Sequence, residues 1–115
     1  MNDNNVNHQI SLQEAVDMTT KYRQNQPTNF PQYESFDVEA VKALIASEQC
    51  AFLRIYFGMK EDNQVDLILV AADAQGQDLL PSSTESTENG DDNLILEDGF
   101  RCPQFCPSDS VLAGN

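Results

Sequence analysis

Two stretches near the middle of the chain have the composition that is typical of β-strands. Residues 51–57 and 65–72 are rich in β-branched and aromatic residues, which suit a pleated, half-buried surface. Between them, residues 58–64 are polar and contain a glycine, so this segment is predicted to be a loop. The pattern therefore predicts an antiparallel hairpin at the centre of the fold.

The two faces of this hairpin differ, because successive side chains of a strand point to opposite sides. Matching the apolar sides predicts a register that pairs Phe57 with Val65 and Ile55 with Leu67. The other face mixes apolar and charged residues, and the register places Tyr56 opposite Asp66. The candidate partner-binding residues of this second face are Phe52, Arg54, Tyr56, Asp66, Ile68 and Val70. Two interpretations stay open: the tail or another strand covers it, or it binds a protein partner or a second copy, since large exposed apolar patches usually mark contacts.

Apolar residues at helical spacing predict two helices before the hairpin. The first covers residues 12–24, and Ser11 with Glu14 has the spacing of a capping box, in which each residue bonds the other's backbone N–H. The second covers residues 38–47, after Asp37 as its predicted N-cap. The pattern as a whole predicts an α+β fold, in which two helices pack on a small antiparallel sheet with the central hairpin.

The remaining segments are shorter or more irregular. Residues 73–78 have the Asp and Gly positions of a tight turn, and residues 94–96 are predicted to be a short third strand. The chain of 115 residues fits a single domain. Within it we expect a flexible N-terminus at residues 1–9, an acidic disordered loop at 81–93, and a tail rich in Cys and Pro at 99–115.

The strongly negative net charge excludes some classes of binding partner. The formal net charge is −13, from 19 acids and 6 bases, and a field of this sign repels nucleic acid and anionic membrane surfaces. No stretch approaches the roughly 20 apolar residues of a membrane helix, and the first residues do not resemble a secretion signal. We therefore expect a cytoplasmic protein that binds neither nucleic acid nor membrane, with its cysteines reduced.

Little in the sequence points to catalysis. The only histidine, His8, lies near the terminus, whereas nucleophilic catalysis pairs a Ser or Cys with a positioned base. A glycine-rich phosphate loop is missing, and no carboxylate stands out as lying in an apolar pocket. The sequence favours a protein that is not an enzyme.

The segment Cys102-Pro-Gln-Phe-Cys106 is the most distinctive local feature, and three interpretations of it compete. Its cysteines could be small apolar residues that pack under a proline-stiffened tail. They could form a disulfide, with a spacing that differs from thioredoxin-like sites. They could also bind zinc, which needs four ligands, and only Cys50 and His8 remain as further nitrogen or sulfur ligands.

Four motifs in this order resemble a family of small bacterial proteins of unknown function. They are Ile10–Ala15 followed by Tyr22-Arg23, the strand Leu53-Arg-Ile-Tyr-Phe-Gly58, the strand and turn Leu69–Gly76, and Cys102–Cys106. The resemblance covers most of the chain except residues 81–93, and Gln104 stands where the family often has a second proline. It implies that the tail is an integral part of the fold, and it implies no activity.

These observations leave three hypotheses for function. The first is a non-catalytic cytoplasmic interaction module, with a homodimer as one form of it, that uses the mixed face of the hairpin. The second is a small zinc or thiol-redox protein that uses Cys102 and Cys106, with Cys50 as a further candidate. The third is an acidic inhibitor, of the immunity-protein type, that docks on a basic partner.

Overall fold

The computed structural model describes residues 7–82, 93–103, 106 and 110–114. The chain divides into two compact units. One unit combines Met1–Thr28 with Cys106–Asn115, and the other is Asn29–Phe105. Most of the predicted flexible N-terminus and of the predicted acidic loop lies outside the described residues. Within those that are described, no helix is long and apolar enough to cross a membrane.

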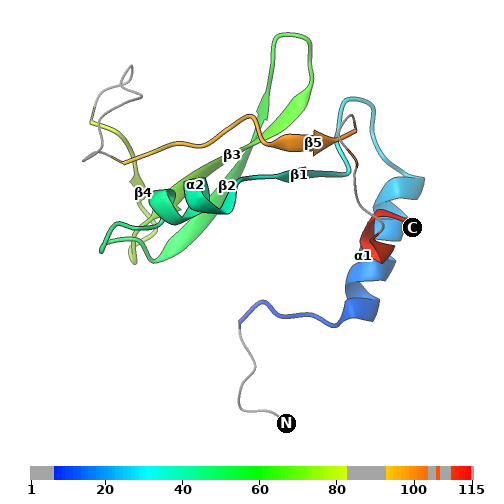
Figure 1. The fold of residues 1–115 in the computed structure, drawn as a ribbon, viewed down its shortest axis with the longest axis horizontal. Helices are drawn as coiled ribbons and strands as arrows, with labels where there is room; N and C mark the ends of the chain where they lie inside the picture. Colours follow the sequence, from blue (N-terminus) through cyan, green and yellow to red (C-terminus); the bar gives the residue numbers. More distant parts are fainter. Residues whose placement is uncertain (1–6, 83–92, 104–105, 107–109, 115) are drawn as a thin grey trace. The chain divides into compact units, whose positions relative to one another are not determined.

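The first unit contains helix α1 (Leu12–Gln24) and a short 3-10 helix, η1 (Val111–Ala113) (Figure 1). The bounds of α1 are those predicted, and the capping box is confirmed: Glu14 N–H donates to the Ser11 hydroxyl at 3.0 Å, and Ser11 N–H donates to the Glu14 carboxylate at 2.9 Å. Near the other end of α1, the Arg23 guanidinium donates to the Leu112 carbonyl at 2.7 Å. This hydrogen bond joins η1 to α1.

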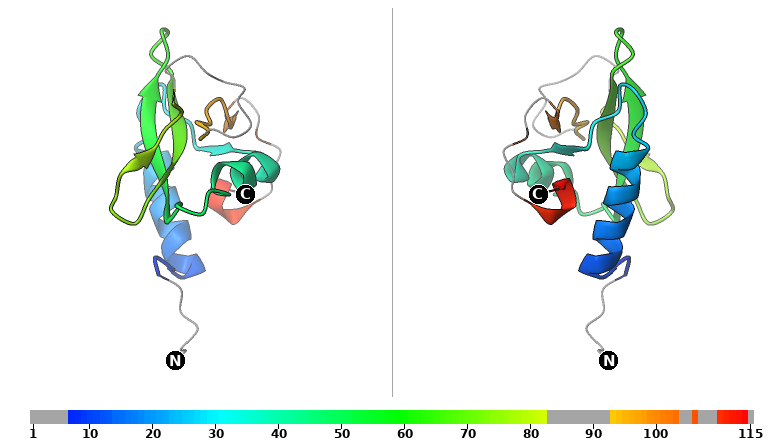
Figure 2. Two further views of the ribbon diagram at one scale, coloured as in Figure 1. Left: turned by 90° about the vertical axis from the view of Figure 1, so that its left-hand side faces the viewer. Right: turned by 90° about the vertical axis from the view of Figure 1, so that its right-hand side faces the viewer.

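The second unit holds the sheets and confirms the α+β class. Its elements, in order, are β1 (Tyr33–Ser35), α2 (Val38–Leu44), β2 (Phe52–Met59), β3 (Val65–Ala72), β4 (Asp78–Leu79) and β5 (Phe100–Cys102). The strands form two antiparallel sheets, β1-β5 and β2-β3-β4. In Figure 2, α2 and β5 lie on the same side of the β2–β3 hairpin. Helix α2 is shorter than predicted, and its predicted cap Asp37 makes no side-chain capping bond.

The central hairpin is confirmed, but its predicted register is wrong by two residues. Val65 pairs with Met59 rather than with Phe57, and Ile55 pairs with Leu69 rather than with Leu67. Because the shift is an even number, each side chain keeps its predicted face. The shift does move the residues within a face, so Tyr56 lies opposite Ile68 instead of Asp66.

A tighter turn than predicted causes this shift. Gly58 and Met59 stay in β2, and Lys60 N–H donates to the Gln64 carbonyl at 2.9 Å. Three residues are left for the turn, and the last of them, Asn63, has φ 69°, as expected for a type I turn closed by a left-handed residue. Glycine suits this position of the strand, because a Cβ here would lie 2.7 Å from the Ile68 side chain.

Strand β3 is the centre of the fold, and most of its residues are buried. On the side away from β2, Val65 N–H donates to the Asn29 carbonyl, and Leu69 exchanges two backbone hydrogen bonds with Leu96. Farther along, Ala71 pairs with Leu79 of β4. The predicted third strand at 94–96 is therefore a single bridge at Leu96. The burial of its residues identifies β3 as the core of the unit. In the strand order β2-β3-β4, β2 lies at the edge of the sheet.

Candidate functional site

Strand β2 is the outer strand of its sheet and is unusually apolar for that position. Six of its large side chains are exposed by between 43% and 73%: Phe52, Leu53, Ile55, Tyr56, Phe57 and Met59. Edge strands of soluble proteins are normally short or carry lysine, proline or a bulge toward the open side. Strand β2 is eight residues long, has no lysine or proline, and its only charged residue is Arg54.

The backbone of β2 also has an open side. Leu69 bonds Leu96 on the side of β3 away from β2, and the carbonyl of Gln64 faces Lys60 of the hairpin. Because N–H and C=O groups alternate between the two sides of a strand, the even-numbered residues of the hairpin bond one another. Leu53, Ile55, Phe57 and Met59 therefore direct their N–H and C=O groups away from β3. In the part of the chain that the structure describes, no strand pairs with that side.

The structure divides the residues that were predicted to bind a partner. Phe52 and Tyr56 are exposed, whereas Arg54 and Ile68 are partly covered. Asp66 and Val70 are only 3% and 2% exposed, because β3 has neighbours along both of its sides. Those two residues cannot belong to an accessible surface, so the exposed part of the hairpin is β2.

A polar cluster holds the single charge of β2. The Arg54 guanidinium donates to the Asp78 carboxylate at 2.6 Å and to the Gly76 carbonyl at 3.0 Å. The Tyr56 hydroxyl donates to the other oxygen of Asp78 at 2.6 Å. The Tyr56 hydrogen bond lowers the pKa of Asp78, and Arg54 lowers it further. The charge of Arg54 is thus balanced inside the sheet, and the open side of β2 carries no uncompensated charge.

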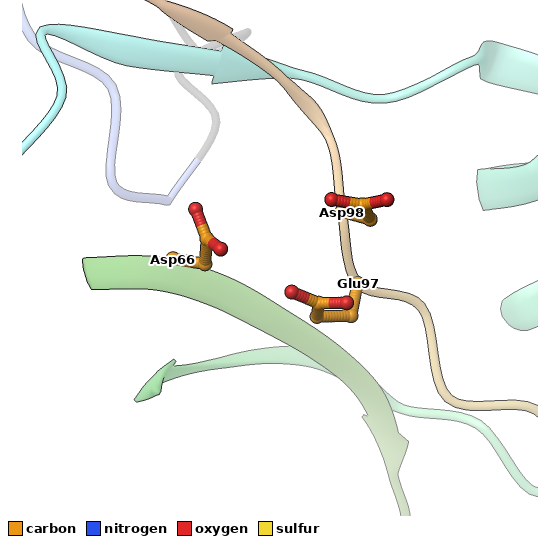
Figure 3. Close-up of side chains that lie close together, drawn as sticks. All are labelled: Asp66, Glu97 and Asp98. Atoms are coloured by element: carbon orange, nitrogen blue, oxygen red, sulfur yellow. The ribbon is translucent and has the colours of Figure 1, made fainter. Parts of the chain in front are cut away.

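A second cluster surrounds the buried carboxylate of Asp66 on β3. Lys60 lies 3.4 Å from one Asp66 oxygen, and Arg101 of β5 lies 3.3 Å from the other. Figure 3 shows Glu97 and Asp98, on the segment before β5, close to Asp66. Burial alone would raise the pKa of Asp66, but hydrogen bonds from Glu34, Gln64 and Lys60 and the charge of Arg101 lower it. This cluster ties the segment before β5, and β5 itself, to β3.

The carboxylates of Asp66, Glu97 and Asp98 could also hold a metal ion, since their oxygens lie within 4.8 Å of one another. The Lys60 ammonium already lies among them, at 3.4 Å from Asp66, 2.9 Å from Glu97 and 3.3 Å from Asp98. A divalent cation would have to displace it. We therefore interpret this cluster as a structural ion-pair network.

Sequence reasoning missed Glu34, which lies on β1. Its Oε1 accepts from Leu67 N–H at 3.4 Å, and its Oε2 is buried without a hydrogen-bond partner among the described residues. Burial, followed by the hydrogen bond with Asp66, raises the pKa of Glu34 to about 7. Nothing local in Tyr33-Glu34-Ser35 signals this pairing.

The cysteines also differ from expectation. Cys102 and Cys106 are disulfide-bonded, so the prediction of reduced thiols is wrong for this pair, and the disulfide interpretation is the one that the structure adopts. Cys102 is 2% exposed, as the packing interpretation also required. Cys50 is a free, partly exposed thiol. Zinc binding by Cys102 and Cys106 would first require reduction of the disulfide, since zinc binds thiolates.

Comparisons with protein-family models, with curated proteins and with solved structures find no match. The resemblance to a family of small bacterial proteins therefore stays a hypothesis.

Proposed function

We propose that this protein is a non-catalytic interaction module that receives a partner β-strand along the open side of β2. The observation that carries the proposal is the combination of exposed apolar side chains and outward-facing backbone groups on one edge strand. An extended segment that adds to such an edge gains main-chain hydrogen bonds, and alternate side chains give specificity. An uncovered edge of this length and composition is prone to aggregation, so we infer that a partner covers it.

One observation favours a second candidate, the thiol-redox protein: Cys102 and Cys106 are disulfide-bonded. Reactive cysteines are normally partly exposed in electropositive surroundings. Cys106 is exposed, but its partner Cys102 is buried. We therefore assign the disulfide a structural role. A cytoplasmic location is part of our proposal, and the disulfide is the observation that weighs against it, because the cytosol keeps most thiols reduced.

Site-specific photo-crosslinking tests the proposed docking strand. A benzophenone amino acid replaces Phe57, which is 73% exposed on β2, and in a matched control it replaces Val38, which is 61% exposed on α2. Both variants are irradiated in an extract of cells that express the protein, and the products are mapped by mass spectrometry.

We expect position 57, and not position 38, to give an intermolecular product whose crosslinked residue lies in a β-strand of the same or another protein. A product confined to the labelled chain itself would show that the chain covers its own edge, and would contradict the proposal. Equal labelling from both positions would contradict it as well.

A further inference from the structure

We infer that the strand received by β2 is β2 of a second copy of this chain, paired antiparallel so that Tyr56 of one copy faces Tyr56 of the other. This inference rests on the proposed docking function and names its partner. The result would be a continuous sheet that joins two β2-β3-β4 halves across a two-fold axis. Such an interface is isologous, with the same surface contributed by each copy.

The backbone of β2 selects this register. Its outward-facing groups belong to Leu53, Ile55, Phe57 and Met59, as the hydrogen bonds of β3 establish. A two-fold axis at Tyr56 pairs Ile55 with Phe57 of the other copy, and Leu53 with Met59. All four outward-facing residues of each copy then make hydrogen-bonded pairs. A two-fold axis at Ile55 would instead pair Met59 with residue 51, and an axis at Phe57 would pair Leu53 with residue 61. Both of these partners lie outside β2.

The side chains are complementary in the same register. The Ile55–Phe57 and Leu53–Met59 pairs are apolar on both sides, and cross-strand pairs of this kind are stabilising. Arg54 comes opposite Gly58, whose missing side chain leaves room, and the guanidinium remains bound to Asp78. No like charges meet on the strand, although each copy carries a net charge of −13.

The exposed side chains of β2 supply the apolar area that a dimer interface buries. A fully covered aromatic side chain buries roughly 150–250 Å², and Phe52, Tyr56 and Phe57 are 52%, 43% and 73% exposed. Leu53, Ile55 and Met59 add further apolar surface, toward the roughly 800 Å² per partner of a standard-size interface. An acidic chain that recruited a basic protein would be expected to present acids at its docking surface, but β2 contains no acidic residue.

Sedimentation velocity of the purified full chain tests the identity of the partner. We expect the wild type to sediment as a dimer at about 100 μM and Phe57→Lys as a monomer, because lysine on an edge strand opposes strand pairing. Val38→Lys, at a similarly exposed position on α2, should remain a dimer. Circular dichroism of each variant shows whether it is folded.

Disulfide trapping tests the register independently of any loss of folding. In a Cys50→Ser background, Tyr56→Cys places two thiols on residues whose Cα atoms would lie about 4.5 Å apart in a non-hydrogen-bonded pair, within the roughly 4.4–6.8 Å that a disulfide spans. Mild oxidation with oxidised glutathione should give a covalent dimer that reduction reverses. Lys42→Cys, on the exposed side of α2, is the collision control and should stay monomeric.

The outcomes separate this inference from the proposed function. A monomeric wild type, or a dimer that persists in Phe57→Lys, overturns self-pairing. The docking function then still stands if position 57 crosslinks to a strand of another protein. A dimer that is lost in Phe57→Lys while Tyr56→Cys does not crosslink overturns the register and the two-fold axis at Tyr56.

Discussion

At the scale of single residues, the most informative side chain is Glu34, which was not identified from the sequence. It comes from β1, yet it faces Asp66 of β3 and accepts from Leu67 N–H, 33 positions away in the chain. A carboxyl group that must share a site with a second acid is held neutral more readily than one in water. Glu34 therefore couples the β1-β5 sheet to β3 through its proton.

This coupling gives the stability of the protein a defined pH dependence. The folded chain keeps the proton of Glu34 up to about pH 7, whereas the unfolded chain releases it near its ordinary pKa of 4.5. Stability contributed by neutral Glu34 is thus fully present below pH 4.5 and is lost as pH rises through about 7. Urea unfolding at a series of pH values should show the free energy of unfolding falling across this window.

The control for this effect is a neutral analogue. Glu34→Gln cannot ionise but can still donate to Asp66, so its free energy of unfolding should lack the decline between pH 4.5 and 7. Glu39→Gln, at an exposed position on α2, should keep the decline of the wild type. Parallel curves for the wild type and Glu34→Gln would show that Glu34 is ionised in the folded protein at neutral pH. Each unit of pKa difference corresponds to about 1.4 kcal/mol, so the total fall in the free energy of unfolding across this window measures the shift.

Residues whose partners are close in sequence were predictable, and those with distant partners were not. The capping box of Ser11 and Glu14 depends on a spacing of three residues within one helix, and it was identified correctly. Asp66 was placed on a partner-binding face because its strand alternates regularly. Its actual environment comes from Lys60, Arg101 and Glu34, and no local pattern links these residues.

At the scale of elements, periodicity identified the hairpin and its faces, but not the pairing of its strands. A period of two fixes which side chains share a face, and it leaves shifts by two residues undetermined. The turn decides between these registers, and its signal was misjudged because Gly58 was taken as part of the loop. In the structure Gly58 lies within β2, where a Cβ would come within 2.7 Å of the Ile68 side chain. The left-handed residue of the turn is Asn63.

A second glycine has a packing role that substitution can measure. A Cβ at Gly99 would lie within 2.7 to 3.0 Å of three ring atoms of Phe36, and an aromatic ring cannot move aside as easily as the end of an aliphatic chain. We expect Gly99→Ala to lower the free energy of unfolding by about 1–3 kcal/mol, the range typical of overpacking. Chemical denaturation at one pH gives the value.

Gly58→Ala is the matched comparison for Gly99→Ala. Its Cβ would meet chiefly the terminal methyl group of Ile68, at 2.7 Å, which can rotate away. The loss of stability should therefore be smaller than for Gly99→Ala. If Gly58→Ala proved more destabilising than Gly99→Ala, the contact between Phe36 and Gly99 would not be the tight packing that we describe.

At the scale of the whole molecule, the net charge opposes the association that the apolar docking surface favours. Each chain carries −13, while the open side of β2 is uncharged, so two copies must approach against electrostatic repulsion. Raising the salt concentration from about 0.1 M to about 1 M shortens the screening length from ~10 Å to ~3 Å. The dissociation constant of the dimer, measured by sedimentation, should fall as salt rises. A dissociation constant that rises with salt would contradict a dimer interface formed by uncharged surfaces.

Amide hydrogen exchange of β2, followed by NMR, tests the central claim most directly. In the Phe57→Lys variant, the amides of Arg54 and Tyr56, which face β3, should be protected, whereas those of Leu53 and Ile55 should exchange rapidly. In the wild type at about 100 μM, the Leu53 and Ile55 amides should become at least about tenfold more protected, because a second strand now bonds them. Protection of these outward-facing amides in Phe57→Lys would contradict the account of β2 as an open docking strand. Rapid exchange of them in the wild type at every concentration would contradict the pairing of β2 with a second copy.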